Sequence, residues 1–269
     1  MNILTEILAA PFMVRALLSG ILLAPVMAAL GIFATLRKMS FFGDGIAHAS
    51  LAGIAIAIVA GFSPLPVALA WSLLVALLVF RLERTTKLPS DTLIGILFTA
   101  SLSIGVIIMS FTHGYQPELV TYMFGSILAI KNSDLTIIAV AAVILLAWIK
   151  SSSRQLTYMS LSQESAEVSG VRTERLTAML YIALAVAIVL GVKILGIILV
   201  SALLILPPAT ARLLTRTFKG YAMLSIALSE LTMLTGLVFS YIFDLPSGAT
   251  IVLSGAALFF LAAITRSRA

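Results

Sequence analysis

The chain passes directly from a polar stretch, GDGIAHAS (residues 43–50), into an apolar stretch, LAGIAIAIVA (residues 51–60). Together the two stretches are long enough to form one membrane-spanning helix. On a helix, Asp44 and His48 are four residues apart and share one face. Ionisable residues are costly inside a membrane and are usually tied to function. Because a carboxylate and an imidazole can together bind a divalent transition metal, this stretch predicts a membrane helix with two candidate metal ligands.

The rest of the sequence has the composition of a membrane protein. Of its 269 residues, 61% are hydrophobic and only 10% are charged, whereas soluble domains carry about 25% charged residues. The apolar runs are continuous rather than alternating, which favours spanning helices over a barrel. We therefore expect a single all-α transmembrane domain over residues 1–269, a polytopic helical bundle with nine spans at 12–36, 44–61, 64–80, 91–112, 134–150, 175–191, 195–213, 221–243 and 247–264.

The positive charges predict how the bundle is oriented. If the N-terminus is outside and nine spans follow, 14 of the 17 Lys and Arg residues fall in inner segments. Lys and Arg collect on the cytoplasmic side of membrane proteins, so we expect the N-terminus outside and the C-terminus inside. Only residues 191–194 divide the sixth and seventh spans, which leaves eight spans as the alternative.

Several function classes are excluded by what the sequence lacks. It has no cysteine, which excludes thiolate metal sites and thiol catalysis. It has no G-x-x-x-x-G-K-[ST] motif, so it does not bind ATP through a P-loop. The net charge of +6 reflects membrane topology and does not indicate nucleic-acid binding. The short loops leave no room for a soluble catalytic domain, so we expect a transporter, not an enzyme, that takes its energy from a partner or an ion gradient.

Three further observations concern the residues that could take part in transport. For the polar pair, the alternative is that Asp44 caps its helix and His48 only packs. Glu230 lies near the middle of the eighth span, where a carboxylate is costly, and is either a metal ligand or proton carrier or else an interhelical hydrogen-bonding group. Pro207 and Pro208, near the inner end of the seventh span, remove backbone donors and predict a kink, with or without a gating role.

The only long polar segment is residues 151–174, which we expect on the cytoplasmic side. Within it, residues 162–169 predict a short helix that ends at Gly170. The helix is either a solvated connector or a docking helix for a soluble partner. In the docking interpretation, Glu164, Ala166 and Gly170 take part in the contact.

Six stretches, in this order, resemble the membrane permease subunits of bacterial ABC importers for zinc and manganese. They are MSFFGD with HAS (39–44 and 48–50), DTLIGI (91–96), YMFG (122–125), AEVSG (166–170), LPPATAR (206–212) and DLPSG (244–248). The resemblance implies a multi-pass protein of the bacterial cytoplasmic (inner) membrane that forms a homodimer within the lipid bilayer. It also implies two partner types, a cytoplasmic ABC ATPase and an extracytoplasmic metal-binding protein, and transport by alternating access.

The resemblance also implies roles for individual residues. Asp44 and His48 match the polar second-span motif and would contact the metal, whereas Glu230 lies in no matching motif. The segment from Ala166 to Gly170 is similar to the loop by which ABC permeases engage their ATPase. No covalent cofactor is expected, because Zn²⁺ or Mn²⁺ is the transported substrate, and imidazole favours zinc. The alternatives are a stand-alone proton-coupled metal carrier and an ABC importer of a metal chelate.

Overall fold

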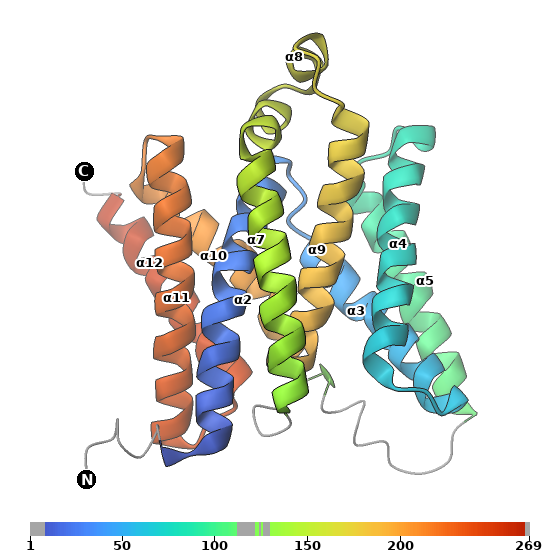
Figure 1. Cartoon of the computed structure of the whole chain (residues 1–269), viewed down its shortest axis with the longest axis vertical. Helices are drawn as coiled ribbons and strands as arrows, with labels where there is room; N and C mark the ends of the chain where they lie inside the picture. Colours follow the sequence, from blue (N-terminus) through green and yellow to red (C-terminus); the bar gives the residue numbers. More distant parts are fainter. Residues whose placement is uncertain (1–8, 112–121, 124, 126–129, 267–269) are drawn as a thin grey trace.

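The computed structural model describes residues 9–111, 122–123, 125 and 130–266. All the regular structure within these residues is helical, which confirms the predicted all-α bundle (Figure 1). The helices are α2 (Pro11–Leu36), α3 (Phe42–Ala60), α4 (Pro64–Thr86), α5 (Ser90–Ser110), α7 (Asn132–Leu161), α8 (Gln163–Val168), α9 (Thr173–Leu195), α10 (Ile197–Leu214), α11 (Phe218–Phe243) and α12 (Ser247–Arg266).

Each of the nine predicted spans corresponds to one helix. Eight helices are long and apolar enough to cross a membrane, and α10 contributes a shorter apolar segment, Leu199–Leu214. The predicted break between the sixth and seventh spans is misplaced, because residues 191–194 are still helical. The break lies at Gly196, which has φ 81° and ψ 165° and ends α9 and begins α10 at once. Glycine adopts this backbone conformation without a side-chain clash, so it is the residue at which the chain turns.

The predicted cytoplasmic loop is mostly helical, which corrects its boundaries. The fifth span was expected to end at Lys150, but α7 continues to Leu161. Leu156 and Met159 in this extension are buried, and the Thr177 hydroxyl on α9 donates a hydrogen bond of 3.3 Å to the Met159 sulfur. The sequence pattern underestimated the length of the helix because the apolar face of this extension is narrow. Its serine hydroxyls donate hydrogen bonds to backbone carbonyls one turn back; the Ser160 hydroxyl, for example, donates to the Leu156 carbonyl at 2.7 Å.

The helix that carries Asp44 and His48 is held in the interior by close backbone contacts. The small residues Ala49, Gly53 and Ala57 are buried along α3. A Cβ atom on Gly53 would lie 2.7 Å from the Ala68 Cα atom of α4, and one on Gly45 would overlap the Ile94 side chain of α5. Small residues from Ala49 to Ala57 thus let neighbouring helices approach closely, and α3 is fixed between α4 and α5.

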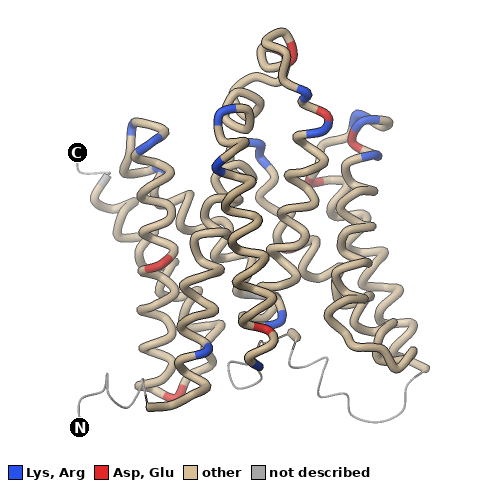
Figure 2. Tube along the Cα trace, in the orientation of Figure 1, with Lys and Arg blue, Asp and Glu red and all other residues tan. Residues whose placement is uncertain are grey.

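The bundle has two groups of helices with buried helices between them. On one side α11 and α12 pack with α2 and α10, and on the other side α4 and α5 pack with α3 (Figure 1). The helices α2, α3 and α9 are the most buried spans, whereas α4, α5 and α7 expose much of their length. Lys and Arg gather at the end of the bundle that carries α8 (Figure 2).

Candidate functional site

The structure places Asp44 and His48 on one open face near the start of α3. The helix begins at Phe42, so Asp44 lies in its first turn, and the N-cap position is Phe41, which makes no side-chain capping bond. His48 Nε2 lies 3.9 Å from Asp44 Oδ1. The side chains of Asp44 and His48 are 51% and 30% exposed. The shared face is as predicted, and capping of α3 by Asp44 is not what the structure shows.

Two neighbouring helices bracket this pair. The Ser201 hydroxyl on α10 donates a hydrogen bond of 3.2 Å to Asp44 Oδ1. On the other side, the His48 ring lies 5.2 Å from the Phe98 ring of α5, measured between centroids. Ser201 is a site residue that sequence reasoning missed, because a hydroxyl 157 positions away from Asp44 shows no spacing signal.

The pair supplies only part of a metal coordination shell. Among the described residues, no group of three or more His, Cys, Asp or Glu side chains could hold a metal ion. Glu230 therefore does not join Asp44 and His48 within one chain; its helix, α11, packs chiefly on α2, α10 and α12. Because zinc sites usually have four ligands, two exposed ligands bind an ion loosely and leave positions for water or for another chain.

The two prolines lie inside α10, which continues through both of them. Proline has no N–H, so Pro208 leaves the carbonyl of Leu204 without its usual helical donor. The helix α2 crosses at this carbonyl, and a Cβ atom on Gly31 would overlap the Leu204 oxygen. The prolines thus lie at a tight crossing between α2 and α10.

The predicted short helix is present as α8, with both ends closed locally. The Ser162 hydroxyl accepts a hydrogen bond of 3.2 Å from the Ser165 N–H at its start. At its end, Gly170 has φ 80°, and the N–H groups of Gly170 and Val171 donate to the carbonyls of Glu167 and Ala166 at 3.0 Å. This paired closure is a Schellman motif, and it confirms the helix and its glycine terminator.

The exposed side of α8 differs from the one that the sequence suggested. Glu164 and Gly170 are exposed, but the Ala166 side chain is buried within the chain. The most exposed apolar side chains here are Val168, at 91%, and Leu161, at 75%. Both side chains are available to a partner that covers this surface. Val168 is therefore a candidate contact residue that sequence reasoning missed; its signal in the sequence was an apolar residue at the end of a polar helix.

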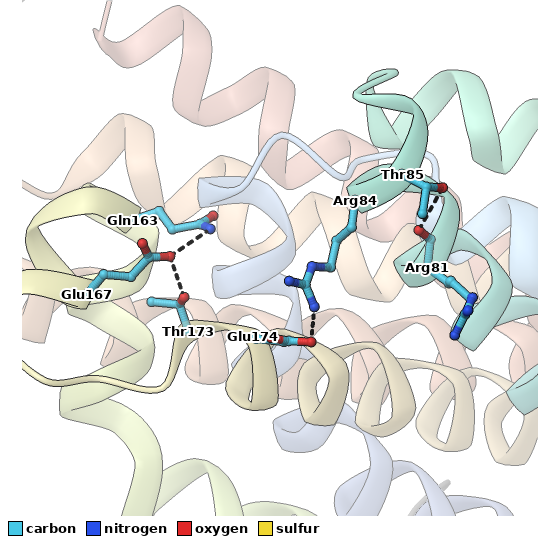
Figure 3. Close-up of polar contacts among 7 residues, drawn as sticks. All are labelled: Arg81, Arg84, Thr85, Gln163, Glu167, Thr173 and Glu174. Atoms are coloured by element: carbon cyan, nitrogen blue, oxygen red, sulfur yellow. Dashed lines mark hydrogen bonds and ion pairs between the residues drawn. The ribbon is translucent and has the colours of Figure 1, made fainter.

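Polar contacts connect α8 to α9 and α9 to α4 (Figure 3). An open cavity of about 910 Å³ lies between α4, α8 and α9. Glu167 accepts hydrogen bonds from the Thr173 hydroxyl at 2.6 Å and from Gln163 Nε2 at 3.2 Å. The bond from Thr173, followed by that from Gln163, holds the pKa of the Glu167 carboxyl below its usual range. Arg84 of α4 and Glu174 of α9 form an ion pair beside them.

Comparison with known proteins identifies relatives along nearly the whole chain. Residues 9–266 match the ABC 3 transport family. The chain is 34% identical to the high-affinity zinc uptake system membrane protein ZnuB of Haemophilus influenzae, over 94% of this chain and 97% of that protein. It is 33% identical to the manganese transport system membrane protein MntC of Listeria innocua, over 93% of this chain and 89% of that protein.

A solved structure shares the fold. A chain of PsaBC from Streptococcus pneumoniae, determined in complex with Fab, matches with a TM-score of 0.85 and 29% identity, over 97% of this chain and 94% of that chain. The fold, the full-length match and the named relatives agree. The chain therefore belongs to the ABC 3 transport family, as a membrane permease of the zinc and manganese importer type.

Proposed function

We propose that this permease carries a divalent transition metal, zinc in preference to manganese, into the bacterial cytoplasm. As the membrane subunit of an ABC transporter it is not an enzyme, and ATP is hydrolysed on a separate subunit. The observation that carries the proposal is the open Asp44–His48 pair on a tightly packed helix. Its imidazole favours zinc over manganese, and relatives named for each metal support the class of cargo.

A second copy of the chain would complete the metal site. Each copy offers two exposed ligands, and a two-fold symmetric dimer brings the same surface of both copies together. Asp44 and His48 from two copies would supply the four ligands that zinc usually takes. Glu230, which lies away from the pair, is proposed as a separate contact along the same pathway.

The end of the bundle that carries α8 is proposed to face the cytoplasm. Lys and Arg gather at this end (Figure 2), as they do on the cytoplasmic side of membrane proteins. The ATPase would dock there on α8, through Glu164, Val168 and the turn at Gly170. The extracytoplasmic metal-binding protein would deliver the metal at the opposite end. This arrangement puts the protein in the bacterial inner membrane, with its N-terminus outside and its C-terminus inside.

Transport would follow alternating access. Binding and hydrolysis of ATP move the two ATPase subunits together and apart, and the α8 helices pass this movement to the membrane helices. The spans then expose the shared Asp44–His48 site to one side at a time. The metal is neither oxidised nor reduced, so the two side chains only need to bind it and release it.

The test is metal accumulation by cells that express the chain with its ATPase and binding protein. We expect ATP-dependent zinc uptake that collapses in His48→Ala. His113→Ala is the matched control, because it removes the only other histidine of the sequence, and we expect it to keep uptake. Full uptake in His48→Ala would contradict the site. Uptake without the ATPase would favour the secondary carrier, and uptake of a chelate but neither free metal would favour the chelate importer.

A further inference from the structure

Two hydroxyls and one carboxylate join three helices near the end of the bundle that carries α8. The Tyr181 hydroxyl of α9 donates a hydrogen bond of 2.5 Å to Glu83 Oε2 of α4. The Ser90 hydroxyl, at the first residue of α5, donates one of 2.6 Å to Glu83 Oε1. The Tyr181 side chain is 0% exposed, and its hydroxyl also lies 3.4 Å from the Ser90 hydroxyl, so the three side chains contact one another. The cluster therefore makes these three helix ends move as one unit.

The cluster is linked to α8 by the contacts in Figure 3. Glu167 of α8 accepts a hydrogen bond from the hydroxyl of Thr173, the first residue of α9. The next residue, Glu174, forms the ion pair with Arg84, which follows Glu83 directly on α4. A displacement of α8 thus reaches the start of α9, whereas the exposed Arg84–Glu174 pair links α9 to α4 only weakly.

The cluster is also linked to the start of α3. The fully buried ring of Phe42 lies edge-on to the Tyr181 ring, with centroids 5.0 Å apart and planes at 79°. Asp91, beside Ser90, lies next to the backbone N–H of Phe41. Phe42 is the first residue of α3 and is two positions before Asp44. The start of α3 is therefore fixed to the same unit.

We propose that Tyr181 and Glu83 are positioning residues that transmit the movement of α8 to the Asp44–His48 pair, an inference that rests on the proposed function. Of the two polar links between α9 and α4 described above, only the hydroxyl–carboxylate bond involves a fully buried side chain, that of Tyr181. The Arg84–Glu174 pair is exposed, and exposed ion pairs contribute little to rigidity. Without the buried link, α8 moves with the ATPase but α3 does not follow.

The test is the number of metal ions transported per ATP hydrolysed, measured in proteoliposomes that contain the full complex. In Tyr181→Phe, which removes one oxygen atom and keeps the ring, we expect this ratio to fall about fivefold or more. ATP hydrolysis and the KM for metal should stay within about twofold of the wild type. Tyr221→Phe is the matched control, since the Tyr221 hydroxyl is also buried but has no hydrogen-bond partner among the described residues; we expect no change in its ratio.

Two further variants show whether the residues act as a pair. Glu83→Gln should lower the ratio in the same direction, and Tyr181→Phe combined with Glu83→Gln should be no worse than the more affected single variant. If the complex that contains Tyr181→Phe does not assemble, the same ratio of metal ions transported to ATP hydrolysed is measured in Glu83→Gln and Ser90→Ala. A wild-type ratio in both variants overturns the proposal. Parallel loss of uptake and ATP hydrolysis at an unchanged ratio also overturns it, because that result indicates a structural role alone.

A second readout does not depend on the cargo. The sequence has no cysteine, so spin labels can be placed at the exposed positions Phe41→Cys, at the N-cap of α3, and Leu214→Cys, at the end of α10. We expect the distance between these labels to change when the ATPase binds a non-hydrolysable ATP analogue, and Tyr181→Phe to abolish the change. A change that persists in Tyr181→Phe overturns the proposal. A wild-type complex that shows the change but transports neither metal contradicts the proposed cargo and leaves the transmission intact.

Discussion

At the residue scale, the orientation of the Asp44 carboxylate depends on a single hydroxyl from another helix. Asp44 Oδ1 lies 3.9 Å from His48 Nε2 and accepts a hydrogen bond of 3.2 Å from the Ser201 hydroxyl. A half-exposed carboxylate without such a donor rotates freely, and a metal ligand that rotates must be ordered each time an ion binds. Ser201 therefore orients one of the two proposed ligands before the metal arrives.

Ser201→Ala tests this role. We expect the KM for zinc uptake to rise about threefold to tenfold, since a hydrogen bond contributes about 1 kcal/mol net, with the maximal rate nearly unchanged. Ser201→Thr, which keeps the hydroxyl, should restore the wild-type KM. The control is Ser225→Ala, which removes a buried hydroxyl that donates to the Tyr221 carbonyl of its own helix. Equal KM values in Ser201→Ala and the wild type would contradict the orienting role.

At the element scale, the crossing of α2 and α10 depends on a glycine opposite a proline. Pro208 leaves the Leu204 carbonyl without its helical donor, and the bare backbone of Gly31 lies against that carbonyl. Each residue is suited to the other: the proline provides the free oxygen, and the glycine lets α2 approach it. The pair thus gives Pro208 a packing role in addition to any part in gating.

Gly31→Ala should break this crossing. The added methyl group would overlap the Leu204 oxygen, and overpacking of this kind costs about 1–3 kcal/mol. We expect a lower thermal unfolding temperature in detergent and reduced yield in the membrane. Gly95→Ala is the control, because no heavy atom lies within 4 Å of a Cβ atom there and alanine favours a helix. Equal unfolding temperatures in Gly31→Ala and the wild type would contradict the tight crossing.

Val168→Asp tests the docking surface of α8. Val168 is almost fully exposed, and covering a valine side chain contributes about 1.5–3 kcal/mol to association. We therefore expect the ATPase to co-purify about tenfold less well with this variant, while the permease stays in the membrane. Leu245→Asp places the same change in the turn between α11 and α12 and should not affect co-purification. Undiminished co-purification with Val168→Asp would remove Val168 from the docking surface.

The sequence predicted elements better than the contacts between them. Hydrophobic runs predicted every spanning helix, and the four-residue spacing put Asp44 and His48 on one face. The break at Gly196 was misplaced because Gly191 and Gly196 look alike in sequence, and only packing shows that Gly191 lies inside a helix, against Met27 and Val200. Ser201 and Tyr181 were missed because their partners, Asp44 and Glu83, are far away in the chain.

At the scale of the whole molecule, if α10 crosses together with the eight longer spans, nine crossings would put the start of α2 and the end of α12 on opposite sides of the membrane. The same count puts α8 and the turn between α11 and α12 on opposite sides. Lys and Arg gather near α8 (Figure 2), which supports the proposal that α8 faces the cytoplasm. This orientation is required if an ATPase is to reach α8 and a metal-binding protein is to reach the other end.

Cysteine labelling tests the orientation directly, since the chain has no cysteine of its own. Val168→Cys and Leu245→Cys place single thiols at exposed positions of α8 and of the α11–α12 turn. In intact spheroplasts, we expect a membrane-impermeant maleimide to label Leu245→Cys but not Val168→Cys, and in inverted vesicles the reverse. Labelling of both positions from one side would mean that one helix between them does not cross, and α10, with the shortest apolar segment, would be that helix. Labelling of Val168→Cys alone in spheroplasts would invert the orientation and would exclude α8 as the ATPase contact.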